Sequence, residues 1–175
     1  LGSSPDQWPY FGGTFASHYY IYPEQEFYKV PDDVPNELAV GANCAFSQVY
    51  YGLDRASLVS GETLLIQGAG GLGLYASAIA KEKGAKVIII DTVSERLETA
   101  KKFGADYVIN ASETTLEERE ALVKEYTEGK GPEAALEVTG FAGAFEEGIH
   151  HLAIMGRYIV IGINSTGVSA EISPG

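Results

Sequence analysis

Residues 63–91 read TLLIQGAGGLGLYASAIAKEKGAKVIIID, and this stretch decides the fold. An apolar run leads into a glycine-rich turn, a segment with helical character follows, and a second apolar run ends on Asp91. Short apolar runs that are bounded by turn residues predict buried strands. Strand, glycine turn, helix, strand and terminal acid follow one another in the order that a dinucleotide-binding βαβ unit requires.

Each of three glycines in the turn has a physical task in such a site. Gly68 makes the tight turn, Gly70 lets the backbone approach a pyrophosphate, and Gly73 lets the helix pack closely on the strand. The N-terminus of the helix then presents free N–H groups and the positive end of its dipole to the phosphates. We therefore expect the pyrophosphate to lie against Gly68, Gly70, Gly71, Leu72 and Gly73.

The acid that ends the second apolar run indicates which dinucleotide is bound. Asp91 lies 18 residues after Gly73, close to the offset at which a carboxylate accepts hydrogen bonds from the adenosine ribose. Thr92 and Val93 follow it, where an arginine would favour a 2′-phosphate, and the charge of Asp91 repels that phosphate. The sequence therefore predicts NAD rather than NADP. Arg96 has two interpretations: it reaches the ribose or a phosphate, or it is a solvated helix residue.

From residue 47 onward, helical and apolar strand-like segments alternate. Such βα repeats with right-handed crossovers predict an α/β fold with a doubly wound parallel sheet, the Rossmann architecture. The predicted helices cover residues 47–56, 71–83, 94–103, 115–128 and 142–152. The predicted strands cover residues 63–67, 86–90, 107–109, 134–137 and 158–161. Since a complete fold of this kind has about six strands, we expect the chain to be part of a larger protein that is cut before the last strand.

Two more strand ends point to the same crevice. The fourth predicted strand is followed by Val138 and Thr139, and the fifth leads into Ile161 and Gly162. Ligands of open α/β sheets lie beyond the carboxyl ends of the strands, where the strand order reverses. These four residues are therefore predicted to line the nicotinamide half of the cofactor, with ordinary turn residues as the alternative.

Residues 1–45 differ in composition from the rest and contain five of the seven prolines and the only tryptophan. Short extended pieces and turns are expected here, with a strand over residues 14–22 that stops at Pro23 and a helix that begins at Asn36. The segment is too short and too rich in turns to bury its own core. We therefore expect it to pack on another part of the protein.

Composition excludes several classes of function. The net charge is −12 and the isoelectric point is about 4.6, which argues against a nucleic-acid surface because phosphate binding depends on clustered lysine and arginine. No apolar run has the length of a membrane span, and the first residues lack the charged-then-apolar pattern of a secretory signal. With a single cysteine, Cys44, an intrachain disulfide is excluded, and a cytoplasmic protein is expected. By itself, Cys44 is either a small apolar residue or a ligand.

Five segments together resemble the zinc-dependent alcohol dehydrogenases of the medium-chain dehydrogenase/reductase family. They are GGTFASHYY (12–20), PDDVP (31–35), NCAFSQ (43–48), the glycine turn, and RLETAKKFGAD (96–106). The resemblance implies a catalytic domain that is split around a coenzyme domain. Residues 1–45 then form the end of the catalytic domain, and residues 46–175 form the NAD-binding domain.

The resemblance also implies roles for individual residues. Cys44 falls where the family often places the third ligand of its catalytic zinc, and Gln48 falls near the nicotinamide. Asp91 and Arg96 match positions that hold the adenosine ribose. The ends of the fourth and fifth strands, Val138, Thr139, Ile161, Gly162 and Ile163, match positions on the nicotinamide side.

The departures from the family limit what this chain is expected to do. The other ligands of the catalytic zinc and the four cysteines of a structural zinc lobe are absent. A catalytic zinc needs about three protein ligands, so we expect the chain alone to bind no zinc tightly and to be inactive. The whole protein is expected to be a homo-oligomer that transfers hydride between an alcohol or carbonyl substrate and NAD, with zinc as Lewis acid.

Three alternatives remain open from the sequence. The first is a zinc-free quinone or enoyl reductase of the same family, which would typically favour NADP. The second is a domain that senses NAD without catalysis. The third is a site for another nucleoside cofactor such as S-adenosylmethionine, which the complete glycine turn disfavours.

Overall fold

The structure is a computed structural model that describes residue 6, residues 16–162 and residue 169. The chain divides into two compact units, residues 1–35 and residues 36–175. In the described part of the first unit no helix or strand forms. The predicted strand over residues 14–22 is therefore wrong for residues 16–22, because a strand needs a paired neighbour and this part of the chain offers none; residues 14 and 15 lie outside the described range.

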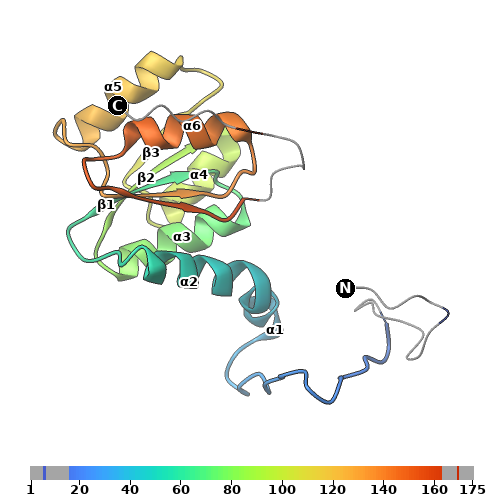
Figure 1. The fold of residues 1–175 in the computed structure, drawn as a ribbon. Helices are drawn as coiled ribbons and strands as arrows, with labels where there is room; N and C mark the ends of the chain where they lie inside the picture. The colour runs from blue at the N-terminus through green and yellow to red at the C-terminus, as the bar shows by residue number, and fades with distance from the viewer. Residues whose placement is uncertain (1–5, 7–15, 163–168, 170–175) are drawn as a thin grey trace. The chain divides into compact units, whose positions relative to one another are not determined.

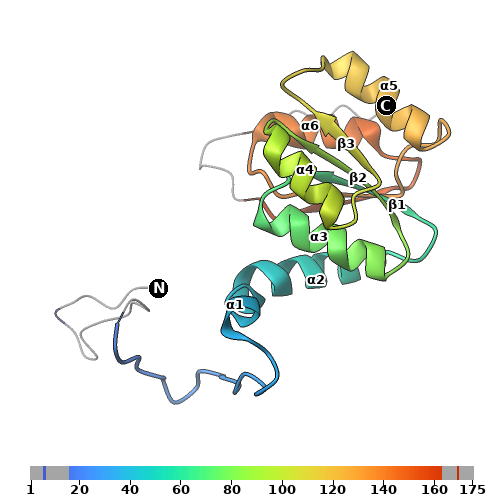
Figure 2. The ribbon, with the colours of Figure 1, turned by 180° about the vertical axis from the view of Figure 1, so that it is seen from behind.

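The second unit contains all the regular elements that the structure describes, and Figures 1 and 2 show them from opposite sides. Helices and strands alternate along the chain from α2 onward. In order, the elements are α1 (Asn36–Ala39), the π-helix η1 (Ala42–Phe46), α2 (Ser47–Arg55), β1 (Thr63–Gln67), α3 (Gly71–Glu82), β2 (Lys86–Asp91), α4 (Ser94–Lys102), β3 (Tyr107–Asn110), α5 (Leu116–Tyr126), β4 (Ala134–Glu137), α6 (Ala142–His151) and β5 (Arg157–Val160).

The described strands form one parallel sheet with the order β3-β2-β1-β4-β5. The chain runs outward from β1 through β2 to β3, then returns to the other side of β1 for β4 and β5. The strand order therefore reverses between β1 and β4, the place where doubly wound sheets bind ligands. The predicted fold class is confirmed.

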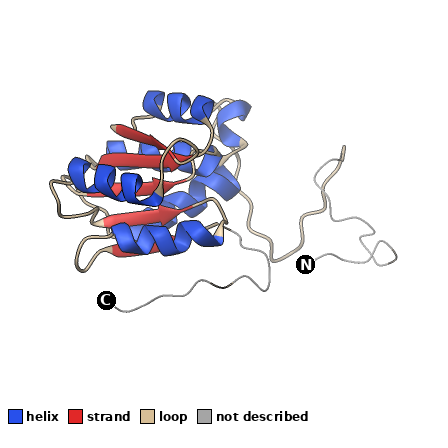
Figure 3. Ribbon diagram, turned by 90° about the horizontal axis from the view of Figure 1, so that it is seen from above, coloured by secondary structure: helices blue, strands red, loops and turns tan. Residues whose placement is uncertain are grey.

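Helices cover both faces of the sheet, as the ribbon views and the colouring by secondary structure in Figure 3 show. One apolar cluster joins α2, α3 and α4 to the sheet residues Leu64, Ile66, Val87, Ile89, Ala134 and Leu136. A second cluster lies on the α5 and α6 side, around the side chains of Leu65, Ile88, Ile109 and Ala135. Alternate residues of β1 and β2 thus enter opposite clusters, so these strands are apolar on both faces.

Most predicted elements lie within one or two residues of their predicted bounds. Lys83, Phe103 and Thr127 are the C-cap residues of α3, α4 and α5, and a glycine with positive φ follows each within two residues, as is common at helix C-termini. The π-helix η1, which contains Cys44, has no counterpart in the prediction. None of the helices in the described residues is long and apolar enough to cross a membrane.

Candidate functional site

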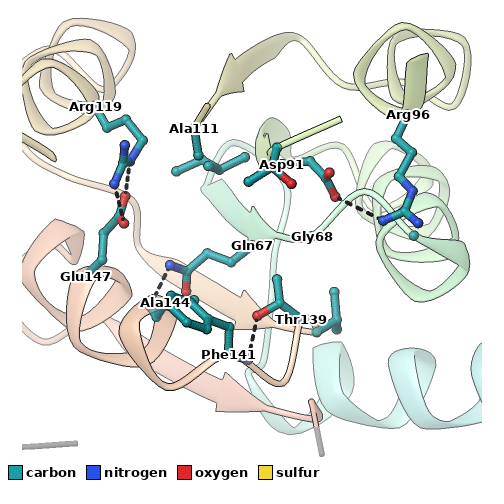
Figure 4. Close-up of a pocket in the computed structure, with 14 residues that line it drawn as sticks. Gln67, Gly68, Asp91, Arg96, Ala111, Arg119, Thr139, Phe141, Ala144 and Glu147 are labelled. Atoms are coloured by element: carbon teal, nitrogen blue, oxygen red, sulfur yellow. Dashed lines mark hydrogen bonds and ion pairs between the residues drawn. The ribbon is translucent and has the colours of Figure 1, made fainter. Parts of the chain in front are cut away.

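A pocket of about 580 Å³ opens at the carboxyl ends of the strands, at the point where the strand order reverses (Figure 4). Its walls come from the ends of β1, β2 and β4, the segment after β3, and the helices α4, α5 and α6. The lining residues are Gln67, Gly68, Gly70, Ile90, Asp91, Thr92, Arg96, Ala111, Arg119, Val138, Thr139, Phe141, Ala144 and Glu147.

The glycine turn has the geometry that its sequence predicts. Gly68 has a φ of +109°, and a Cβ atom there would lie 2.9 Å from Thr139 Cγ2. A Cβ atom at Gly73 would overlap the Gly68 carbonyl, so only glycine lets α3 pack so closely on the turn. A Cβ atom at Gly70 would meet no protein atom within 4 Å. No protein contact therefore requires a glycine at position 70, where the pocket wall is open to a ligand.

The N-terminus of α3 is available to an anion. Gly70 is its N-cap residue, and no side chain caps the helix. The first N–H groups of an α-helix have no partner within the helix, and together with the helix dipole they favour a phosphate group. The pocket and the free helix end therefore meet at Gly70.

Asp91 ends β2, and its carboxylate is tied to the glycine turn. Oδ2 accepts a hydrogen bond from the backbone N–H of Ala69 at 2.6 Å, and Oδ1 accepts one from the N–H of Val93 at 2.9 Å. The Nη1 atom of Arg96 lies 4.0 Å from Oδ2, with the Arg96 side chain 58% exposed and that of Asp91 7% exposed. Each oxygen keeps lone-pair capacity for a hydroxyl donor from the pocket, and two backbone contacts hold the carboxylate in place.

The β4 side of the pocket contains a polar network that spans three elements. The Gln67 amide donates to the Ala144 carbonyl at 2.6 Å, and the Tyr158 hydroxyl donates to Gln67 Oε1 at 2.6 Å. Burial, with the negative charges of Glu137 and Glu147, raises the pKa of Tyr158 above its ordinary value, so this hydroxyl stays protonated as a donor. The network fixes the first turns of α6 against β1 and β5.

An ion pair joins α5 to α6 at the opposite end of the pocket from Arg96 (Figure 4). Arg119 Nε and Nη2 donate to the two Glu147 oxygens at 2.6 and 2.9 Å, and the side chains of both residues are 13% exposed. His151 Nε2 lies 3.2 Å from Glu147 Oε1. Burial raises the pKa of Glu147, but the hydrogen bonds from His151 and Arg119 outweigh it and lower this pKa to about 2. The carboxylate is therefore ionised at neutral pH.

The structure brings together six of the eleven residues that the sequence nominates for the cofactor: Gly68, Gly70, Asp91, Arg96, Val138 and Thr139. Of the others, Gly71, Leu72 and Gly73 begin α3 beside the pocket, with Leu72 packed against the core. Ile161 packs against the same core, and Gly162 lies close to Glu137 and Gly140. Ile163 lies outside the described residues.

Sequence reasoning missed eight of the lining residues, and half of them carried a signal. Gln67, Ile90, Thr92 and Ala111 lie at or directly after strand ends, where pocket residues are expected. Phe141 and Ala144 lie at the start of α6, and Arg119 and Glu147 lie inside helices. Nothing in the sequence pattern relates the last two to each other, since 28 residues separate them.

Cys44 lies in η1 and is exposed. The described part of the chain contains no cluster of three or more His, Cys, Asp or Glu residues that could hold a metal ion. A zinc site needs about three protein ligands at 2.0–2.3 Å. The residues described here therefore do not form one, and a role for Cys44 as a ligand would require further ligands from elsewhere.

Residues 71–174 match the family described as zinc-binding dehydrogenase. The chain is 34% identical over 164 residues to the 5-exo-hydroxycamphor dehydrogenase of Pseudomonas putida, covering 93% of this chain and 45% of that protein. It is 39% identical over 162 residues to the L-threonine 3-dehydrogenase of Thermococcus kodakarensis, covering 92% and 45%. A solved alcohol dehydrogenase from Thermotoga maritima superposes with a TM-score of 0.89 at 33% identity, over 98% of this chain and 47% of that one.

The chain spans about half the length of these relatives, and the matches cover nearly all of it. The family match begins at Gly71, within the glycine turn, and extends through α6 and β5. The chain therefore belongs to the zinc-binding dehydrogenases, the medium-chain dehydrogenase/reductase family that its sequence motifs resemble.

Proposed function

We propose that the pocket binds NAD(H) and that this chain is the coenzyme-binding part of an oxidoreductase that transfers hydride between an alcohol or carbonyl substrate and NAD(H). The observation that carries the proposal is the position of Asp91. Its carboxylate ends β2, lines the same pocket as the glycine turn, and is held there by the N–H groups of Ala69 and Val93. A fixed anionic acceptor beside an uncapped helix end suits a ribose next to a pyrophosphate.

The pocket offers a place for each part of the dinucleotide. The pyrophosphate lies at the N-terminus of α3 beside Gly70, and the hydroxyls of the adenosine ribose donate to Asp91. The nicotinamide ribose and ring extend across the strand reversal toward Val138 and Thr139. The cofactor would supply hydride transfer, with NAD⁺ as acceptor and NADH as donor, and the residues of this chain would bind and orient its nicotinamide ring.

Preference for NAD over NADP follows from the charge at the ribose end. A 2′-phosphate would lie next to the Asp91 carboxylate, and like charges at close distance repel. Arg96 is the one cation in the pocket lining near Asp91. Its side chain is largely exposed, and its Nη1 atom lies 4.0 Å from Asp91 Oδ2. A single exposed cation does not offset the loss of the ribose hydrogen bonds and the repulsion.

For the whole protein we propose a zinc-dependent dehydrogenase that acts on a small alcohol or carbonyl substrate and assembles as a homo-oligomer. The support is the family match and the dehydrogenase names of the relatives. Zinc ligands besides Cys44 and most of the substrate pocket would come from parts of the protein that this chain does not contain. The chain alone is then a cofactor-binding part without turnover.

The proposal is tested by calorimetric titration of the chain and of its Asp91→Ala variant with NAD⁺ and with NADP⁺. The unsubstituted chain should bind NAD⁺ more tightly than NADP⁺. Since hydrogen bonds to a charged group contribute about 1.5–3 kcal/mol, the variant should bind NAD⁺ at least about tenfold more weakly and lose most of its discrimination against NADP⁺.

Glu95→Ala is the matched control, because Glu95 is an exposed acid nearby in the first turn of α4. It should keep the preference for NAD⁺. An Asp91→Ala variant with an unchanged ratio of the two affinities would contradict the ribose assignment, and a chain that binds neither dinucleotide would contradict the proposed function.

A further inference from the structure

Glu137 is a fully buried acid at the end of β4, and it does not line the pocket. Its side chain is among the largest that are wholly buried, with 0% exposure. An ionised carboxylate in such a place costs several kcal/mol unless hydrogen bonds compensate it. The partners of its two oxygens therefore indicate what it does.

One oxygen of Glu137 holds the turn that follows its own strand. Oε1 accepts hydrogen bonds from the N–H of Thr139 at 2.5 Å, the Thr139 hydroxyl at 2.5 Å, and the N–H of Gly140 at 2.8 Å. The Thr139 hydroxyl oxygen in turn accepts from the N–H of Phe141 at 2.9 Å, the contact drawn in Figure 4. A chain of hydrogen bonds thus runs from the buried carboxylate to the pocket wall that Thr139 and Phe141 form.

The rest of Glu137 faces the end of the next strand. Its backbone carbonyl accepts hydrogen bonds from the N–H groups of Ile161 and Gly162 at 2.9 and 3.1 Å. Its second oxygen, Oε2, is buried and has no hydrogen-bond partner among the described residues. A Cβ atom at Gly162 would overlap this oxygen and the backbone nitrogen of Gly140. Glu137 therefore lies between the segments that follow β4 and β5 and is in close contact with both.

We propose that Glu137 is a positioning residue for the nicotinamide end of the pocket, fixing the turn over residues 138–141 and its spacing from Gly162. It touches no ligand, and it acts through Thr139 and the backbone around it. Groups that contact a ligand must be held by a supporting layer to keep a productive geometry. The inference rests on the proposed function, since it assumes that the nicotinamide lies beyond β4 and β5.

The test compares a ligand that has the nicotinamide ring with one that lacks it. NADH is titrated by the fluorescence of its reduced nicotinamide, and ADP-ribose by calorimetry, with the chain and its Glu137→Ala variant. The variant should bind NADH about tenfold more weakly and lose the fluorescence change of the bound ring. Its Kd for ADP-ribose should stay within about twofold, because Asp91 and the glycine turn are untouched.

Two further variants separate positioning from folding. Glu137→Gln keeps an acceptor oxygen at the same reach and should restore most of the NADH affinity. Glu137→Asp keeps the carboxyl group but shortens the side chain by one methylene, so it should show the NADH defect of the alanine variant. A thermal melt reveals whether Glu137→Ala folds. If it does not, the NADH affinities of Glu137→Gln and Glu137→Asp test the positioning role without it.

The outcomes are distinguishable from a failure of the proposed function. Equal losses of NADH and ADP-ribose affinity, or no loss of either, would overturn the role of Glu137 while leaving the dinucleotide site intact. An unsubstituted chain that binds neither ligand would overturn both the role and the proposed function.

Discussion

Each half of the pocket lies beside a strand that ends in a buried carboxylate, but only one of the two acids lines the pocket. Asp91 ends β2 and Glu137 ends β4, and both accept backbone N–H groups from an adjacent turn. Asp91 lines the pocket with its side chain 7% exposed, whereas Glu137 is wholly buried and outside the lining. Asp91 faces the pocket, and Glu137 faces the backbone of the turn that follows its strand.

Under the proposed function, the same local chemistry would serve recognition of the ribose at one end and positioning of the backbone at the other. An acid that keeps lone-pair capacity toward the pocket can read a ribose through its hydroxyls. Glu137 instead accepts hydrogen bonds from three protein donors with one oxygen. Its proposed effect is therefore on the position of the turn that forms the pocket wall. Substitutions at the adenosine end should therefore change affinity for any ligand with that ribose, and substitutions at Glu137 should change affinity only for ligands with the ring.

The largest effect is expected where the two halves meet, at Gly70. A Cβ atom there meets no protein atom within 4 Å, and its φ of −73° suits any residue. Gly70→Val should therefore fold normally but fill the space at the N-terminus of α3, where we propose that the pyrophosphate binds. We expect NADH and ADP-ribose to bind about 100-fold more weakly, a loss of about 2.7 kcal/mol.

Calorimetry measures both affinities, and a thermal melt checks the fold. Ala78→Val is the matched control, since residue 78 is an exposed position of the same helix outside the pocket lining. It should leave both affinities as they are. If Gly70→Val binds ADP-ribose normally, the pyrophosphate does not bind at the glycine turn. The two halves of the pocket would then not meet at Gly70.

A smaller effect is expected at a third acid, Glu147, which lines the pocket but is paired by Arg119 and His151. Glu147→Gln should lower the free energy of unfolding at pH 7 by about 2 kcal/mol, between the values typical of exposed and of buried ion pairs. Its pKa of about 2 lies below the ordinary 4.5. The stability that Glu147 contributes is therefore complete above pH 4.5 and is lost as the pH falls toward 2.

Urea unfolding at pH 7 and pH 3 measures this contribution. The difference in the free energy of unfolding between the chain and the Glu147→Gln variant should be smaller at pH 3. Glu120→Gln on α5 removes an exposed pair with Lys124 and serves as the control, with a smaller loss expected. If the difference in the free energy of unfolding between the chain and Glu147→Gln is the same at both pH values, the ion pair does not lower the pKa of this carboxyl.

The smallest effect is expected at Arg96, the exposed partner of Asp91. Since the pair is 4.0 Å apart and the guanidinium is solvated, Arg96→Ala should weaken ADP-ribose binding only about twofold to threefold, and less in high salt. Lys101→Ala in the last turn of α4 is the control. Calorimetry at two salt concentrations measures both, and a loss beyond about tenfold would make Arg96 a principal ligand of the adenosine end.

The sequence predicts the sheet and its flanking helices well because short apolar runs stop at polar or glycine residues. The predicted strands over residues 63–67 and 134–137 have the observed bounds, and the fifth differs by one residue at each end. The helices after β1, β2 and β3 end close to a glycine, which marks their C-termini. Local signals therefore suffice wherever a strand or helix is bounded by such residues.

Tertiary proximity is what the sequence does not reveal. Arg119 and Glu147 belong to helices that the pattern predicts, but their pairing depends on how α5 packs beside α6. The sequence does not distinguish Glu137 from Asp91, because both are acids at strand ends, and only burial and contacts separate the two. The expected strand over residues 14–22 fails for its described part because extended propensity does not supply a pairing partner.

A crystal structure of the chain with NAD⁺ bound is the most direct test of the central claim, that the strand reversal holds a dinucleotide with its adenosine end at Asp91. We predict an adenosine ribose hydroxyl within about 3 Å of an Asp91 oxygen, the pyrophosphate at Gly70, and the nicotinamide ring beside Val138 and Thr139. A dinucleotide bound away from this pocket, or with its adenosine ribose out of reach of Asp91, would contradict the account.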